Sequence, residues 1–165
     1  LAVWYWRLKM LSGAARDGAK AAKTVANLPR KMRFQNKARK GGLQVVDDPR
    51  AAATIMMLEV AQARGALTQS QQATIRAEIM QPFEYSESDA EELITQSGWL
   101  SRESAAPHAV MGRMASLLQN TPALGPKELV DVDGMLVSVS EAEGTPSPEQ
   151  LDLIETYRRK TGLRV

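Results

Sequence analysis

The fold is decided by one stretch of the chain, Val60-Ala61-Gln62-Ala63-Arg64-Gly65-Ala66-Leu67-Thr68-Gln69-Ser70-Gln71. A degenerate second copy lies near the other end, Val139-Ser140-Glu141-Ala142-Glu143-Gly144-Thr145-Pro146-Ser147-Pro148-Glu149-Gln150. The copies align without a gap at an offset of 79 residues, the separation of Gly65 from Gly144. The matching pairs are Val60 with Val139, Ala63 with Ala142, Gly65 with Gly144, Thr68 with Ser147, Gln71 with Gln150 and Ile75 with Ile154.

Each copy has the pattern of a helix end, a Gly stop, a short loop and a newly capped helix. Gly can adopt the left-handed conformation that closes a helix. Thr68 or Ser147 can then cap the next helix, while Gln71 or Gln150 completes a capping box. The repeat therefore predicts two helix-loop-helix units.

The composition agrees with a soluble helical domain. Of the 165 residues, 44% are hydrophobic and 5% are aromatic, and eight are Met. Gly and Pro fall mostly between periodic segments, which suits helices packed on helices. Because there is no Cys, a Cys nucleophile, a zinc-Cys site and a disulfide scaffold are excluded.

Capping signals and apolar spacing predict the individual helices. Asp48-Pro49 begins one that is apolar on nearly every side from Ala51 to Ala63, as expected of a central helix. Thr68 begins the next, with Ile75 and Ile79 inward, and Gln81-Pro82 is predicted to end it. Further helices follow from Ser86, near Ala106 and from Pro126.

The last two helices carry the second copy. The stretch Val130 to Val137, β-branched around Asp-Gly, could form a hairpin. We favour a helix, because the repeat places Val139 at a helix end and a lone hairpin is marginal in water. Ser147-Pro148 begins the final helix, predicted to turn Leu151, Ile154 and Tyr157 towards the core. The fold predicted for residues 43–165 is an all-α bundle of about six helices.

The overall charge of +2 hides a division between two parts of the chain. Residues 1–42, the arm, carry 11 Lys or Arg against Asp17 alone, a net charge of +10. Residues 43–165, the body, hold the other 10 of the 21 basic residues and 18 of the 19 acidic ones, a net charge of −8. This asymmetry indicates a basic segment that seeks a polyanion, unless the arm folds back on the body.

The arm is predicted to begin with a basic amphipathic helix over residues 1–28. Its apolar run is too short to cross a bilayer, which needs about 20 residues, and the order of charges is wrong for a secretory signal. Pro29 ends the helix, and a basic run closes on Gly41-Gly42. The candidate binding residues are Trp4, Tyr5, Trp6, Arg7, Leu8, Lys9, Leu11, Arg16, Lys20, Lys23, Arg30, Lys31, Arg33, Lys37, Arg39 and Lys40.

Three partners suit the arm. At an anionic membrane surface, on the cytoplasmic face, the aromatic rings would lie at headgroup level and the cations would meet lipid. Heptad-like spacing from Leu1 to Val25 also suits a protein partner or a second copy of the chain. Nucleic acid is disfavoured, since single-strand binders interleave stacking rings with cations, whereas these rings gather at one end.

At the repeated turn and cap the chain resembles the TerB-like family, the all-helical domains of tellurite-resistance protein B and of membrane-anchored J-domain co-chaperones. The resemblance covers about Asp48 to Leu163. It is carried by Met57-Leu58-Glu59-Val60-Ala61-Gln62-Ala63-Arg64-Gly65, Ala90-Glu91-Glu92-Leu93 and Ala142-Glu143-Gly144. It implies a non-enzymatic interaction domain, with a link to stress response.

The resemblance also implies a metal or stress-signal site beside the two turns. Glu59 and Glu143 fit the family's acidic positions, and Glu141 lies near the second. Arg64 stands where the family has Asp, and Ser138 takes the position equivalent to Glu59. A hard divalent cation usually needs more than one carboxylate. Without a metal, Glu59 is expected to pair with a cation and Arg64 to lie on a solvated loop.

No pattern in the sequence predicts catalysis, and we expect no enzyme activity. There is no glycine-rich phosphate loop, and His108 is the single His. A Ser-His-Asp triad would have to be built around it, but no recognisable nucleophile lies nearby in the sequence. Neighbouring carboxylates such as Glu91 and Glu92 face different ways on a helix.

Overall fold

The computed structural model describes residues 46–102 and 106–163. These two ranges form helices and contain no strand. Six helices follow one another: α3 (Pro49–Gln62), α4 (Gln69–Phe83), α5 (Glu87–Arg102), α6 (Pro107–Gln119), α7 (Pro126–Ser140) and α8 (Pro148–Thr161). The predicted all-α bundle of about six helices is confirmed. The helix predicted for residues 1–28 lies outside the described residues.

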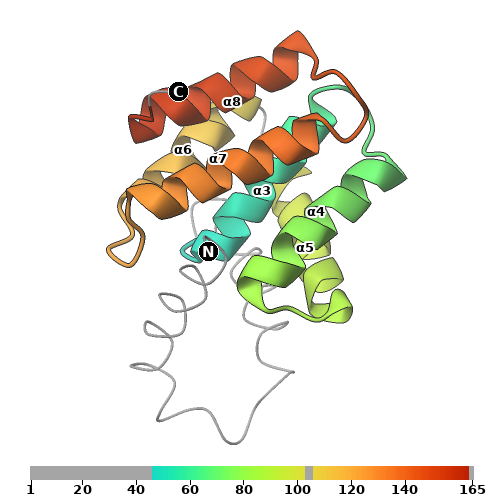
Figure 1. Ribbon diagram of the computed structural model, residues 1–165, viewed down its shortest axis with the longest axis horizontal. Helices are drawn as coiled ribbons and strands as arrows, with labels where there is room; N and C mark the ends of the chain where they lie inside the picture. The colour runs from blue at the N-terminus through green and yellow to red at the C-terminus, as the bar shows by residue number, and fades with distance from the viewer. Residues whose placement is uncertain (1–45, 103–105, 164–165) are drawn as a thin grey trace, which may run out of the picture.

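Helix α3 is the centre of the bundle. Every residue from Ala51 to Ala61 is buried, and α3 contacts each of the other five helices. Figure 1 shows it between the α4–α5 pair and the α6–α8 pair, with α7 crossing beside it. A helix that is apolar on all sides must be covered on all sides. The sequence prediction of a central helix is therefore confirmed.

The helices begin where the capping signals predicted. A side-chain oxygen accepts a hydrogen bond from a backbone N–H two or three residues further on, as an N-cap does. The cap pairs are Asp48 with Arg50 at 2.8 Å, Thr68 with Gln71 at 3.1 Å, Ser86 with Asp89 at 3.1 Å and Ser147 with Gln150 at 3.2 Å.

The stretch from Val130 to Val137 lies entirely within α7. Val132 and Leu136, four residues apart, are both buried in the core, as two positions on one face of a helix would be. The choice of a helix over a hairpin is confirmed.

Helix α4 does not end at Gln81-Pro82 as predicted but continues through Pro82 to Phe83. Pro82 lies so close to the C-terminus that its missing N–H costs one hydrogen bond of the last turn. Burial of the Phe83 ring, which packs edge-on against Tyr85 with centroids 6.0 Å apart, favours this extension by one residue beyond Pro82. Glu84 then closes the helix in the left-handed conformation, with φ of 54°.

The inward face of α8 was predicted wrongly at one position. Leu151 is 52% exposed, whereas Leu153, Ile154 and Tyr157 are buried. The core lies on the side of Leu153 because Gln150, three residues earlier on the same face, is buried against α3. Gln150, Leu153, Ile154 and Tyr157 follow the i, i+3, i+4, i+7 spacing of one helix face. Leu151 lies at the edge of that face, about 100° around the helix from Gln150.

Candidate functional site

The two repeated loops lie side by side at one end of the bundle (Figure 1). The Thr68 hydroxyl donates a hydrogen bond to the Glu143 carboxylate. Arg64 Nη1 donates to the Thr145 carbonyl oxygen at 2.9 Å. Gly65 and Gly144 both have positive φ, 138° and 101°, a region that favours glycine. The two copies of the repeat therefore occupy matched surroundings and are bonded to each other.

Both capping glutamines reach the C-terminal end of α3. Gln71 Nε2 donates to the Ala61 carbonyl at 3.0 Å, and Gln150 Nε2 donates to the Val60 carbonyl at 3.1 Å. The last carbonyls of a helix lack partners within the helix, and here they are buried among other elements. Besides opening α4 and α8, the two loops therefore complete the end of the central helix.

The structure does not bring the three predicted metal ligands together. Glu59 lies in the contact between α3 and α5, Glu143 lies in the second loop, and Glu141 is the exposed residue that ends α7. In residues 46–102 and 106–163, no three His, Cys, Asp or Glu side chains form a group that could hold a metal ion.

Glu59 is a buried acid whose partner is a hydroxyl rather than the cation expected from the sequence. It is 7% exposed, and Ser101 Oγ donates a hydrogen bond to its carboxylate. Burial raises the pKa of Glu59, and the hydrogen bond from Ser101 lowers it in part. One turn earlier on α5, the buried Ser97 hydroxyl has no hydrogen-bond partner. The α3–α5 contact thus holds an ionisable group at a cost in stability.

Glu59→Gln is expected to stabilise the protein at pH 7. A carboxyl group with a raised pKa in the folded state contributes stability at low pH that is lost as the pH rises through its folded pKa, and an amide does not titrate. The gain should therefore shrink as the pH falls towards 4. Urea unfolding at pH 7 and pH 4 measures it, with the exposed Glu155→Gln as control. A loss of stability at pH 7, or a gain equal at both pH values, would contradict it.

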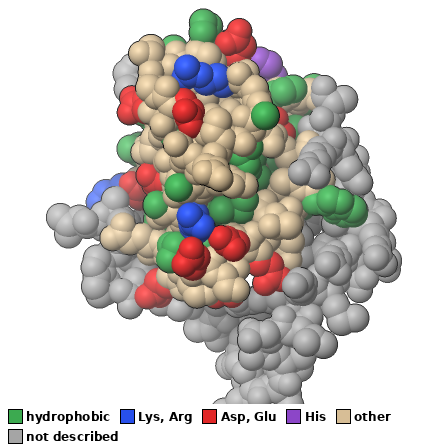
Figure 2. All heavy atoms as spheres, turned by 90° about the vertical axis from the view of Figure 1, so that its right-hand side faces the viewer, with side chains coloured by type: hydrophobic (Ala, Val, Ile, Leu, Met, Phe, Trp, Pro, Cys, Tyr) green, Lys and Arg blue, Asp and Glu red, His purple; other side chains and the backbone are tan. Residues whose placement is uncertain are grey.

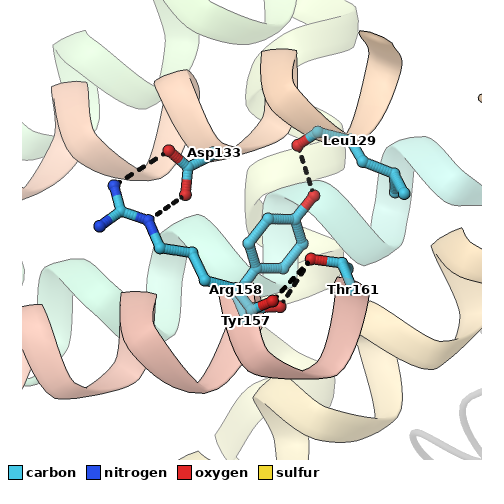
Figure 3. Close-up of polar contacts among 5 residues, drawn as sticks. All are labelled: Leu129, Asp133, Tyr157, Arg158 and Thr161. Atoms are coloured by element: carbon cyan, nitrogen blue, oxygen red, sulfur yellow. Dashed lines mark hydrogen bonds and ion pairs between the residues drawn. The ribbon is translucent and has the colours of Figure 1, made fainter. Parts of the chain in front are cut away.

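Polar contacts also join α7 to α8 (Figure 3). Arg158 donates to both carboxylate oxygens of Asp133, at 2.8 and 3.0 Å, and Tyr157 donates its hydroxyl to the Leu129 carbonyl at 2.7 Å. Burial raises the pKa of Tyr157, and the negative charges of Asp133 and Asp131 raise it further. Tyr157 therefore remains a neutral donor, and these contacts hold the two helices together.

His108 forms a surface contact between α6 and α8. Its Nδ1 lies 2.9 Å from Thr156 Oγ1 and its Nε2 lies 3.1 Å from Asp152 Oδ2. This order of carboxylate, imidazole and hydroxyl is that of a nucleophile-activating triad. However, the Thr156 hydroxyl donates to the Asp152 backbone carbonyl, and the imidazole and carboxylate are each more than half exposed. The group lacks the water-excluded setting in which such a triad stabilises charge.

The first half of α5 carries an acidic cluster, which we define as Glu87, Asp89, Glu91 and Glu92. From α4, Arg76 Nη1 lies 3.3 Å from Glu87 and 2.8 Å from Glu91. Figure 2 looks onto the side with α4 and α5 and shows acidic side chains gathered around a basic one. Only the Glu91-Glu92 pair of this cluster is identified from the sequence. The spacing of acids at 87, 91 and 92 would have shown the cluster, but not the reach of Arg76 from the neighbouring helix.

All candidate binding residues of the arm, from Trp4 to Lys40, lie outside the described residues. What the structure defines is the class of the body, an all-α bundle built on a repeated unit of loop and capped helix. No protein-family model, no curated protein and no solved structure matches this chain.

Proposed function

We propose that the protein is a non-enzymatic adaptor, a TerB-like helical domain held on the cytoplasmic face of a membrane by its basic arm. The observation that carries this proposal is the division of charge, +10 in residues 1–42 against −8 in residues 43–165. Basic residues near an anionic bilayer contribute about 1 kcal/mol each. Aromatic and apolar side chains in the same arm supply the second signal that stable anchoring needs.

The body supports an interaction role rather than a catalytic one. The polar side chains of the paired loops form hydrogen bonds within the protein, and the buried Tyr157 and Asp133 join helices. None of the helices in the described ranges is long and apolar enough to cross a membrane. In this proposal the arm supplies the membrane attachment, and the exposed faces of the bundle remain for partners.

The TerB-like part of the proposal rests on the sequence resemblance, and the pairing of the two loops agrees with it. Both copies place a Gly of positive φ between a helix end and a capped helix. A role in stress response follows from the resemblance alone. Arg64, at the position of the family's Asp, donates to a carbonyl of the other loop, so in this chain the position links the two copies.

A second candidate is a subunit of a larger assembly that docks through its first helix. The heptad-like spacing from Leu1 to Val25 favours it. In that case Trp4, Leu8 and Leu11 would be buried against another chain, or against a second copy, instead of in lipid.

Flotation of the full chain with vesicles tests the proposal. Binding is expected to vesicles that contain anionic lipid and to be much weaker with neutral vesicles. Lys37→Gln with Lys40→Gln removes about 2 kcal/mol of attraction, roughly a thirtyfold loss of affinity. Arg113→Gln with Lys160→Gln, two exposed positions of the body, gives the same change in net charge and should have little effect. Equal binding to both kinds of vesicle, or none to either, would count against the membrane role.

A further inference from the structure

The outer face of α5 combines negative charge with an exposed tryptophan. Glu91, Thr95 and Trp99 follow one another at spacings of four residues, which places them on one stripe of the helix, and Glu92, three residues before Thr95, borders this stripe. The opposite face, with Ala90, Leu93 and Leu100, is buried in the core. Trp99 is 47% exposed. A large exposed apolar side chain beside a charged cluster is a common feature of interaction sites.

The charge of this face is incompletely balanced by the described residues. The acidic cluster has four carboxylates, and its ion pairs within the described ranges are both made to Arg76. Glu92 accepts a hydrogen bond from the neutral Gln96 at 3.1 Å, and Asp89 accepts one from Ser86 at 2.8 Å. A cationic segment would thus find on this face two carboxylates, of Asp89 and Glu92, whose hydrogen bonds from other described side chains come from neutral groups.

The arm enters the body next to this face. Helix α3 begins at Pro49, and the Arg50 guanidinium lies 5.4 Å from the centre of the Tyr85 ring. Tyr85 precedes the start of α5 by two residues. Val46, the first described residue, packs on the core. The chain before Val46 therefore starts from the end of the bundle where the acidic cluster lies.

We propose that the basic run Arg30–Lys40 of the same chain docks on the outer face of α5, along the acidic cluster and Trp99, and that anionic lipid competes for it. Lys40 is six residues from Val46, a reach of about 20 Å. The stripe from Glu87 to Trp99 is about 18 Å long. A tether this short gives a local concentration on the order of millimolar. Arg side chains of the run can also stack on the Trp99 ring.

The consequence is a protein with two positions of its arm. Docked on α5, the cations of Arg30–Lys40 face carboxylates; on a membrane, the same cations face lipid. Because one set of charges cannot serve both, a highly anionic surface is needed to release the arm. The competition with lipid rests on the membrane role proposed above, whereas the docking on α5 does not.

Carbodiimide cross-linking of the full chain tests the docking directly, because it couples a Lys amine to a carboxylate in contact with it. Cross-links from Lys31, Lys37 or Lys40 to Glu87, Glu91 or Glu92 are expected in the monomer, at a yield independent of protein concentration. Cross-links found only in dimers would assign the face to a second copy and overturn the proposal, as would their absence.

Quenching of Trp99 by acrylamide gives a second measure. Trp4→Phe with Trp6→Phe leaves Trp99 as the sole Trp of the three. In this single-Trp protein, adding Glu91→Gln with Glu92→Gln should raise the quenching constant of Trp99 about twofold. Without these two substitutions, 1 M salt should raise the constant by a similar factor, because it screens the charges between the arm and α5. The control variant is Glu149→Gln with Glu155→Gln, which removes two exposed acids of α8 and so changes the net charge by the same amount. It should leave the quenching constant unchanged. Equal quenching in all these samples would overturn the docking.

Vesicle affinity then separates the two proposals. In the full chain with Trp4 and Trp6 retained, Glu91→Gln with Glu92→Gln is expected to raise the affinity of the protein for anionic vesicles. The rise should be threefold to tenfold relative to the control variant Glu149→Gln with Glu155→Gln. If cross-links and Trp99 protection are found but no form of the protein binds vesicles, the membrane role fails and the docking stands. If vesicles bind all forms equally and Trp99 is unprotected, the docking fails and the membrane role stands.

Discussion

Leu153→Ala is expected to lower the free energy of unfolding by about 2 to 5 kcal/mol, whereas Leu151→Ala should change it by less than about 0.5 kcal/mol. Leu153 is 2% exposed and Leu151 is 52% exposed. Removing the Leu153 side chain loses its transfer free energy and leaves a cavity between α8 and the rest of the core. Removing that of Leu151 leaves only solvent where the side chain was.

Urea unfolding followed by circular dichroism measures both variants, and each is the control of the other, since the chemical change and the helix are the same. The comparison also decides how α8 is rotated about its axis. Equal losses, or a larger loss for Leu151→Ala, would mean that the face predicted from the sequence spacing points inward after all.

Gln150→Glu is expected to cost about 3 kcal/mol at pH 7. The new carboxylate can still accept the hydrogen bond that the Ser147 N–H gives to Gln150 at 3.0 Å. It cannot donate to the Val60 carbonyl, which would then be buried without that donor and would face a negative charge. Burial should raise the pKa of the introduced carboxyl group. The Gln150→Glu variant should therefore be less destabilised at acid pH, where this carboxyl group is protonated, and more destabilised as the pH rises.

Gln71→Glu should behave in the same way, because Gln71 makes the equivalent bond to the Ala61 carbonyl. Gln69→Glu, in the exposed first turn of α4, introduces the same charge where a helix N-terminus favours it, and should be neutral or slightly stabilising. Thermal unfolding at pH 7 and pH 4 measures all three variants. A harmless Gln150→Glu would show that the amide is not needed at the end of α3.

The sequence predicted what depends on neighbouring residues. The four caps at Asp48, Thr68, Ser86 and Ser147 each need only the next two or three residues, and all four form. The repeat predicted the helix at Val130–Val137 against its local β-branched composition. The prediction failed at Pro82, where a local rule for ending a helix was outweighed by burial of Phe83.

Contacts between distant residues could not be predicted in the same way. The repeat predicts that Gln150 forms a capping box with Ser147. Nothing in the pattern indicates that the Gln150 side-chain amide also donates to the Val60 carbonyl, 90 residues away. Likewise the pairing of Asp133 with Arg158 depends on how α7 and α8 are rotated. Glu59 was predicted as a ligand from its place in a family motif, and its burial against Ser101 depends on the packing of α5.

The sharing of one helix end by Gln71 and Gln150 has a consequence for the duplication itself. Exact internal symmetry would have given each copy its own acceptor, and the second glutamine would have bonded within residues 126–165. Instead, the later copy ends on a carbonyl of the earlier one. We therefore expect that neither half folds on its own and that the two copies unfold together as a single cooperative domain.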